Sequence, residues 1–183
     1  MPEIKKSSLF DISAILAKID IGERQHVAEL GCGNFGFFVF PMARLVGKEG
    51  RVYAVDILKT TLADITNEAK KANLTQVVPV WSDLEVFKAT KIESSSLDSA
   101  LLVNVLHQSE KKVEILREAI RLLKRNGKLM IVEWKITDSP LGPPPDKRVN
   151  LTSLKNVVSK IGLEIVEEFP AGPYHFGLTL IKQ

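Results

Sequence analysis

Residues His26 to Gly36 read His-Val-Ala-Glu-Leu-Gly-Cys-Gly-Asn-Phe-Gly, and this stretch decides the fold. A short apolar run, 26–30, is followed at once by glycines 31, 33 and 36, in the spacing Gly-x-Gly-x-x-Gly. Glycine tolerates positive φ angles and lets a backbone approach a ligand closely. The pattern is therefore typical of a strand that turns through a ligand-binding loop into a helix.

Alternating strand and helix patterns continue on both sides of this loop. Apolar runs predict strands at 26–30, 51–55, 76–81, 97–103 and 128–134, and helical spacing predicts helices at about 8–20, 37–46, 58–72, 113–123 and 151–161. Repeated β-α-β units force parallel strands with right-handed crossovers. The predicted fold class is therefore α/β, an open doubly wound Rossmann-like sheet with helices on both faces, in a single domain, 1–183.

Several boundaries depend on single residues. Pro41 should delay or kink its helix, Ser109 is a candidate cap for the 113–123 helix, and Asn126-Gly127 should end it. The proline-rich segment 138–146 should be a loop after the 128–134 strand. Two final strands, 163–169 and 174–182, are joined by so short a turn, 170–173, that they should pair antiparallel.

Composition excludes several classes of protein. The 25 basic and 22 acidic side chains give a net charge of only +3, which disfavours nucleic acid as a partner. The single cysteine, Cys32, excludes an intramolecular disulfide and a multi-thiolate metal site. No window approaches a membrane span of about 20 apolar residues, and no signal peptide is recognisable, so we expect a cytoplasmic protein. A homodimer is left open.

Two cofactors fit the glycine spacing, because Asp56 at the end of the second strand can accept ribose hydroxyl hydrogens in either case. An NAD-binding oxidoreductase is one reading. Glu29, just before the glycines, disfavours it, since a carboxylate is costly beside a pyrophosphate but suits the cationic S-adenosylmethionine. Asp83 can accept a hydrogen bond from an adenine amine, and the chain supplies no second domain for a hydride acceptor.

Four segments, 27–33, 53–56, 82–84 and 102–107, together resemble the successive motifs of class I S-adenosylmethionine-dependent methyltransferases. The resemblance implies an enzyme of the EC 2.1.1 class, with S-adenosylhomocysteine as product. It also implies a seven-stranded sheet of order 3-2-1-4-5-7-6 with strand 7 antiparallel. Within the class, the chain is similar to small single-domain relatives of the quinone-biosynthesis methyltransferases, partly through residues 37–41.

The resemblance assigns a cofactor role to particular positions. Glu29 is expected near the methionine amino group, Asp56 at the ribose, and Asp83 at the adenine amine. The full expected cofactor set is Glu29, Gly31, Cys32, Gly33, Asn34, Gly36, Asp56, Ile57, Ser82, Asp83, Leu84, Asn104 and Val105.

His107 is the best-placed candidate for a catalytic base, because histidine titrates near neutral pH. A polar strand end with no catalytic role is the alternative. Candidate acceptor-site residues are Trp134, Lys135, Tyr174 and His175, although a surface position is the default expectation for His175. The acceptor is expected to be a small molecule methylated on oxygen or carbon, and a non-catalytic S-adenosylmethionine-binding partner protein is the remaining alternative.

Overall fold

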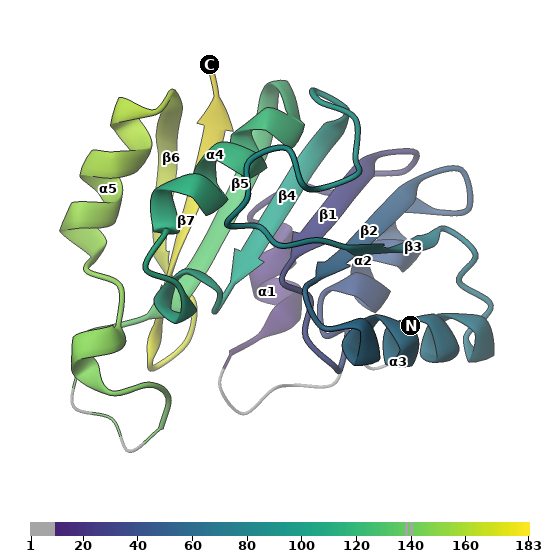
Figure 1. The fold of residues 1–183 in the computed structure, drawn as a ribbon, viewed down its shortest axis with the longest axis horizontal. Helices are drawn as coiled ribbons and strands as arrows, with labels where there is room; N and C mark the ends of the chain where they lie inside the picture. The colour runs from purple at the N-terminus through teal and green to yellow at the C-terminus, as the bar shows by residue number, and fades with distance from the viewer. Residues whose placement is uncertain (1–9, 138, 140) are drawn as a thin grey trace.

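The computed structural model describes residues 10–137, 139 and 141–183 (Figure 1). Residues 8 and 9 of the predicted first helix, and Asp138 and Pro140 of the predicted proline loop, lie outside the described residues. The helices are α1 (Ile12–Ala17), α2 (Val39–Val46), α3 (Lys59–Lys71), α4 (Lys112–Leu122) and α5 (Leu151–Lys160), with 3-10 turns η1 (Leu106–Gln108) and η2 (Pro145–Lys147). The strands are β1 (His26–Leu30), β2 (Arg51–Asp56), β3 (Val77–Trp81), β4 (Leu97–Val103), β5 (Leu123–Trp134), β6 (Leu163–Pro170) and β7 (His175–Lys182).

The strands form one sheet of order β3-β2-β1-β4-β5-β7-β6, as predicted. β1 to β5 pair in parallel, and β7 runs antiparallel to both β5 and β6. The order reverses direction between β1 and β4. Loops at the carboxyl ends of parallel strands separate at such a point, which is where open α/β sheets bind ligands.

Alternate residues of each strand point to opposite faces of the sheet, so a hydrophobic core forms on each face. On one face, Leu102 and Ile131 pack with Leu116 of α4 and Val158 of α5. On the other face, residues such as Leu101 pack with the apolar sides of α1, α2 and α3. Figure 1 shows α4 in front of the central strands and α1 behind them. The sheet is therefore buried on both faces, which explains its near-continuous apolar runs.

The first two helices begin where capping chemistry allows. The Asp11 side chain accepts a hydrogen bond from the Ala14 amide (3.1 Å), so α1 begins at Ile12. Pro41 falls in the first turn of α2, where its missing amide hydrogen is not needed by the helix. The predicted late start is confirmed, since α2 begins at Val39 rather than 37.

The junction between α4 and β5 differs from the prediction. Lys111 is the N-cap residue of α4, and the Ser109 hydroxyl instead accepts the Lys111 amide at 2.8 Å. The helix ends at Leu122, directly before β5 begins. Asn126, with φ +62°, lies within β5 where its pairing with β4 shifts register between Leu97 and Ser99. The Asn-Gly pair therefore marks an irregularity in the strand, not a helix end.

Each of the two outer strands carries a feature that disfavours the addition of another strand. β3 contains Pro79, which has no amide hydrogen to donate. β6 changes register between Ile165 and Glu167. β6 also carries several carboxylates, at residues 164, 167 and 168.

Candidate active site

The loop after β1 requires glycine for two different reasons. Gly31, Gly33 and Gly36 have φ angles of +83°, +60° and +57°. A Cβ on Gly31 would lie 2.5 Å from a methyl group of Val105, after β4, whereas a Cβ on Gly33 would meet nothing within 4 Å. Gly31 therefore lets two loops approach closely, and Gly33 leaves an open surface over which a ligand can lie.

Asp56, at the carboxyl end of β2, supports this loop. One carboxylate oxygen accepts the Gly33 amide at 3.1 Å and the other accepts the Leu58 amide at 2.9 Å. Each oxygen has capacity for a further hydrogen bond. Asp56 can therefore receive ribose hydroxyls without releasing the loop.

Glu29 is buried beneath the same loop, with 3% of its surface exposed. Its carboxylate accepts the Val39 amide at 3.0 Å, at the first residue of α2. Burial raises the pKa of Glu29 well above its usual range, the Val39 hydrogen bond opposes that rise, and the nearby Asp56 charge adds to it. The carboxylates of Glu29 and Asp56 repel each other. They therefore favour a cationic ligand, because a positive charge offsets that repulsion.

Asn104 supplies a second unusual group where β4 ends. Its backbone has φ +57° and its amide donates to the Val132 carbonyl at 2.8 Å. Its side-chain oxygen is buried and accepts no hydrogen bond from any residue that the structure describes. A buried acceptor without a partner is costly, and an ammonium group such as that of the methionine moiety would satisfy it.

The third side of the site follows β3. Ser82 is buried and its amide donates to the Asp56 carbonyl at 3.1 Å, while Asp83 is half-buried. The side chains of Ile57 and Trp81 are each 53% exposed, and the Trp81 ring nitrogen donates to the Ile57 carbonyl at 2.8 Å. Exposed apolar surface beside Asp83 suits a flat heteroaromatic ring. Leu84 packs into the core.

The side chains of Asn34 and Cys32, two members of the expected cofactor set, are packed or hydrogen-bonded within the protein itself. The Asn34 side-chain oxygen accepts the Thr61 hydroxyl at 2.5 Å, which ties the loop to α3. Cys32 is 5% exposed, and burial, followed by the charges of Glu29 and Asp56, raises the pKa of its thiol. A thiol held protonated is a poor nucleophile, so Cys32 is not a candidate for nucleophilic catalysis.

His107 is held by a residue that the sequence did not single out. Glu133 of β5 is fully buried, and one of its oxygens lies 3.0 Å from Nδ1 of His107. The other oxygen accepts the amides of Leu106 (2.6 Å) and His107 (3.3 Å). Because a carboxylate only accepts hydrogen bonds, Nδ1 of His107 is the donor in this contact.

The predicted acceptor residues gather at the paired ends of β5 and β7, where Trp134 lies opposite His175. The expected surface position of His175 is wrong, because its ring is fully buried between Trp134 (centroids 4.1 Å apart) and Phe10 (5.2 Å). The sheet register places it there, since Phe10 covers that face. Tyr174 is half-buried, and its carbonyl accepts the Lys135 amide at 2.8 Å.

Arg148 shapes the wall beside Trp134 and was also missed from sequence. Its guanidinium lies 5.9 Å from the Trp134 ring centre. It donates to four carbonyls of the chain that follows β5, those of Lys135, Thr137, Leu141 and Pro143. A buried cation satisfied by carbonyls is a structural element of the loop.

A cleft of about 460 Å³ opens next to this wall. Lys135 and Ile136, after β5, form one side, and Phe176 of β7 and Phe169 of β6 form another. The start of α5 completes it. The volume is in the range of small-molecule sites, about 300–1,000 Å³.

Comparison with known proteins identifies this arrangement. A family profile described as "Methyltransferase domain" matches residues 21–163. The chain belongs to this methyltransferase family. It is a methyltransferase of the EC 2.1.1 class that depends on S-adenosylmethionine.

Solved structures show the same fold. A SAM-dependent methyltransferase from Aquifex aeolicus superposes with a TM-score of 0.86 at 22% identity, covering 96% of this chain and 91% of that one. The [4+2]-cyclase SpnF gives 0.79 at 14% identity, covering 93% and 79%. NcsB1, an O-methyltransferase from neocarzinostatin biosynthesis solved with S-adenosyl-L-homocysteine and 1,4-dihydroxy-2-naphthoic acid, gives 0.75 at 18%, covering 94% and 54%.

The candidate site combines residues at the carboxyl ends of β1 to β5, and its chemistry fits S-adenosylmethionine. It offers a glycine surface, the carboxylates of Glu29 and Asp56, and the Asn104 oxygen, which has no partner among the described residues. Within the described ranges, 10–137, 139 and 141–183, no helix is long and apolar enough to cross a membrane.

Proposed function

We propose that this methyltransferase methylates a hydroxyl group on a small aromatic molecule, with His107 as the catalytic base. The observation that carries the proposal is the 3.0 Å contact between Nδ1 of His107 and the buried Glu133. That contact fixes the ring orientation and leaves Nε2 free to take a proton. The His107 side chain is 12% exposed, so its proton can pass on to solvent.

When bound, S-adenosylmethionine supplies a methyl group on a positively charged sulfur. Nε2 of His107 would accept the proton of the acceptor hydroxyl, whose oxygen would take the methyl group that the cofactor supplies, and S-adenosylhomocysteine would leave as the neutral thioether. Glu133 stabilises the imidazolium that results. Glu29, Asp56, Asp83 and Asn104 hold the cofactor in the sites proposed for them, so that orientation supplies much of the acceleration.

The aromatic nature of the acceptor rests on the cleft beside Lys135. Its walls include Phe169, Phe176 and Ile136, and Lys135 and Glu168 also line it, so it carries one basic and one acidic group. The apolar walls suit an aromatic ring. The resemblance to quinone-biosynthesis methyltransferases, and the aromatic hydroxy acid held by NcsB1, support the same class of acceptor.

A panel of phenols, aromatic amines and carbon acids tests the proposal, with the methylated atom identified by mass spectrometry and NMR. We expect O-methylated phenols, and we expect His107→Asn to lower kcat by about 10²–10⁴-fold. Glu133→Gln should lower kcat by a similar factor, because the Gln amide group can donate to Nδ1 and so place the ring proton on Nε2. His26→Asn, at the amino end of β1, is the matched control.

Three results would contradict the proposal. The first is unchanged kcat in His107→Asn, and the second is methylation on carbon. The third is tight binding of S-adenosylhomocysteine without turnover on any acceptor, which is the behaviour of a non-catalytic partner protein.

A further inference from the structure

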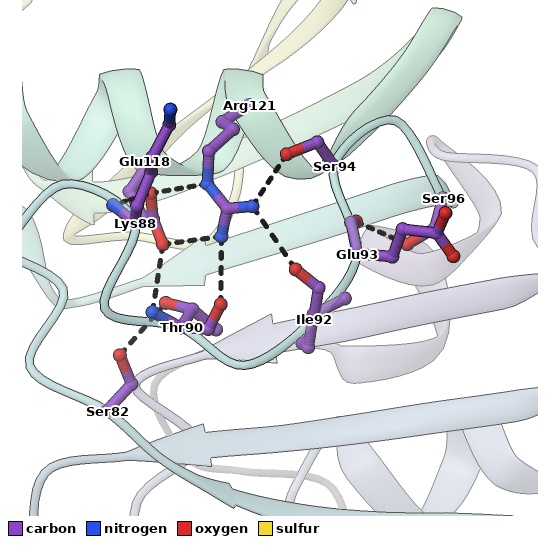
Figure 2. Close-up of polar contacts among 9 residues, drawn as sticks. All are labelled: Ser82, Lys88, Thr90, Ile92, Glu93, Ser94, Ser96, Glu118 and Arg121. Carbon is purple, nitrogen blue, oxygen red and sulfur yellow. Dashed lines mark hydrogen bonds and ion pairs between the residues drawn. The ribbon is translucent and has the colours of Figure 1, made fainter.

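The segment between β3 and β4, residues 82–96, contains no regular helix or strand. It carries Asp83 at one end and then runs beside α4 before β4 begins. We call it the 82–96 loop. Figure 2 shows that two charged side chains of α4, Glu118 and Arg121, contact this loop between Lys88 and Ser94.

Glu118 is fully buried although it is ionisable. Its carboxylate accepts the amides of Lys88 (2.9 Å) and Thr90 (3.1 Å) and two hydrogen bonds of 2.8 Å from Arg121. Although burial opposes ionisation, the hydrogen bonds from Arg121, Lys88 and Thr90 lower the pKa of Glu118 to about 2. The carboxylate also holds Lys88 at φ +66°, a conformation that lysine rarely adopts.

Arg121 binds the far half of the loop. Its guanidinium donates to the carbonyls of Thr90 (2.9 Å) and Ile92 (3.2 Å) and to the Ser94 hydroxyl (2.8 Å). With the bonds to Glu118, its planar fork is fully used, as a rigid bridge requires. Together Glu118 and Arg121 fix the backbone from residue 88 to residue 94.

One further contact joins this clamp to the cofactor site. The hydroxyl oxygens of Thr90 and Ser82 lie 2.9 Å apart, and both side chains are buried (Figure 2). The Ser82 amide donates to the carbonyl of Asp56, and the next residue is Asp83. An unbroken chain of hydrogen bonds therefore runs from α4 to the residue before Asp83.

We propose that Glu118 and Arg121 are positioning residues for the adenosine half of the cofactor, acting through Thr90 and Ser82 on Asp83. The proposal rests on the placement of Asp83 at the adenine amine in the proposed function. The buried i, i+3 pair sets the position of the loop, and the loop sets the position of the carboxylate that binds adenine.

The same helix provides a control. Glu114 and Arg117 form an ion pair with the same i, i+3 spacing and a 2.9 Å contact, but their side chains are 36% and 55% exposed. Neither side chain hydrogen-bonds the 82–96 loop. Glu114→Gln therefore repeats the chemical change of Glu118→Gln on α4 without touching the clamp.

Calorimetry with S-adenosylhomocysteine and with 5′-methylthioadenosine, which lacks the amino acid moiety, tests the proposal independently of any acceptor. Glu118→Gln should raise both dissociation constants by about tenfold and by the same factor, whereas Glu114→Gln should change neither by more than about twofold. Thr90→Val keeps the backbone bonds to the clamp and removes only the hydroxyl contact, so it should weaken both ligands by about threefold. This mild variant serves if Glu118→Gln does not fold.

The double variant Asp83→Asn with Glu118→Gln identifies the route. If Glu118 acts through Asp83, adding Glu118→Gln to Asp83→Asn should weaken binding by less than about twofold more. Fully multiplicative effects, or a greater loss for S-adenosylhomocysteine than for 5′-methylthioadenosine, would overturn the proposal. If Asp83→Asn alone leaves binding unchanged, the placement of Asp83 fails instead.

Discussion

Replacing His175 by leucine should flatten the acid dependence of stability. The ring of His175 is fully buried between Trp134 and Phe10, and neither of its nitrogens has a hydrogen-bond partner among the residues that the structure describes. Burial, followed by the electrostatic effect of the neighbouring His107, Lys135 and Arg148, lowers the pKa of His175 to about 4, from 6.5. The folded protein therefore holds this ring neutral at pH values where the unfolded chain protonates it.

The size of the effect follows from this difference. Between pH 6.5 and 4 the unfolded chain binds a proton that the folded chain does not, so the free energy of unfolding falls as the pH falls. The stability is fully present above pH 6.5. The complete loss, reached near pH 4, is about 3 kcal/mol, at 1.36 kcal/mol for each pKa unit. At pH 5 the loss is about 2 kcal/mol.

Urea unfolding of the wild type and of His175→Leu at pH 8, 7, 6 and 5 measures this pH-dependent loss of stability. The difference in free energy of unfolding between the two proteins should stay constant from pH 8 to pH 7. It should then shift in favour of the variant by about 2 kcal/mol from pH 7 to pH 5. Parallel curves over the whole range would refute the reasoning, because they would mean that His175 titrates alike in the folded and unfolded chains.

Two other substitutions or probes have definite outcomes. Gly31→Ala adds a methyl group 2.5 Å from Val105 at a φ of +83°. It should therefore destabilise the fold by about 1–3 kcal/mol, measured by thermal unfolding, and weaken S-adenosylhomocysteine binding. An unchanged melting temperature would contradict this prediction. Cys32, buried and with a raised pKa, should react with a thiol reagent such as iodoacetamide only after unfolding; rapid labelling of the native protein would show that the loop opens.

Much of the fold is legible in the sequence because buried parallel strands are short apolar runs. His26–Leu30 and Leu97–Val103 have the predicted ends, since glycine or polar residues interrupt the apolar pattern on both sides. The helix end predicted from the Asn126-Gly127 pair is wrong, because left-handed conformations occur in irregular strands as well as after helices. Only the pairing of β5 with β4 distinguishes the two, and pairing is not local.

The site was predictable where one segment carries the signal. The spacing of the glycines and Asp56 is enough to predict their role. The roles of Glu133 and Glu118 instead depend on contacts with loop residues that are distant in sequence. Glu118 looks like an ordinary surface partner of Arg121 on a helix. Glu133 had one readable sign, a carboxylate inside an otherwise apolar strand, which is the same sign that drew attention to Glu29.

The outer strands determine how this molecule can associate with others. A second sheet added to β3 would face Pro79, and one added to β6 would meet a strand with a register shift. Edge-to-edge growth, the route by which open sheets polymerise, is thus obstructed at both sides. These edges favour helices and loops as the surfaces through which two copies of this chain would pair.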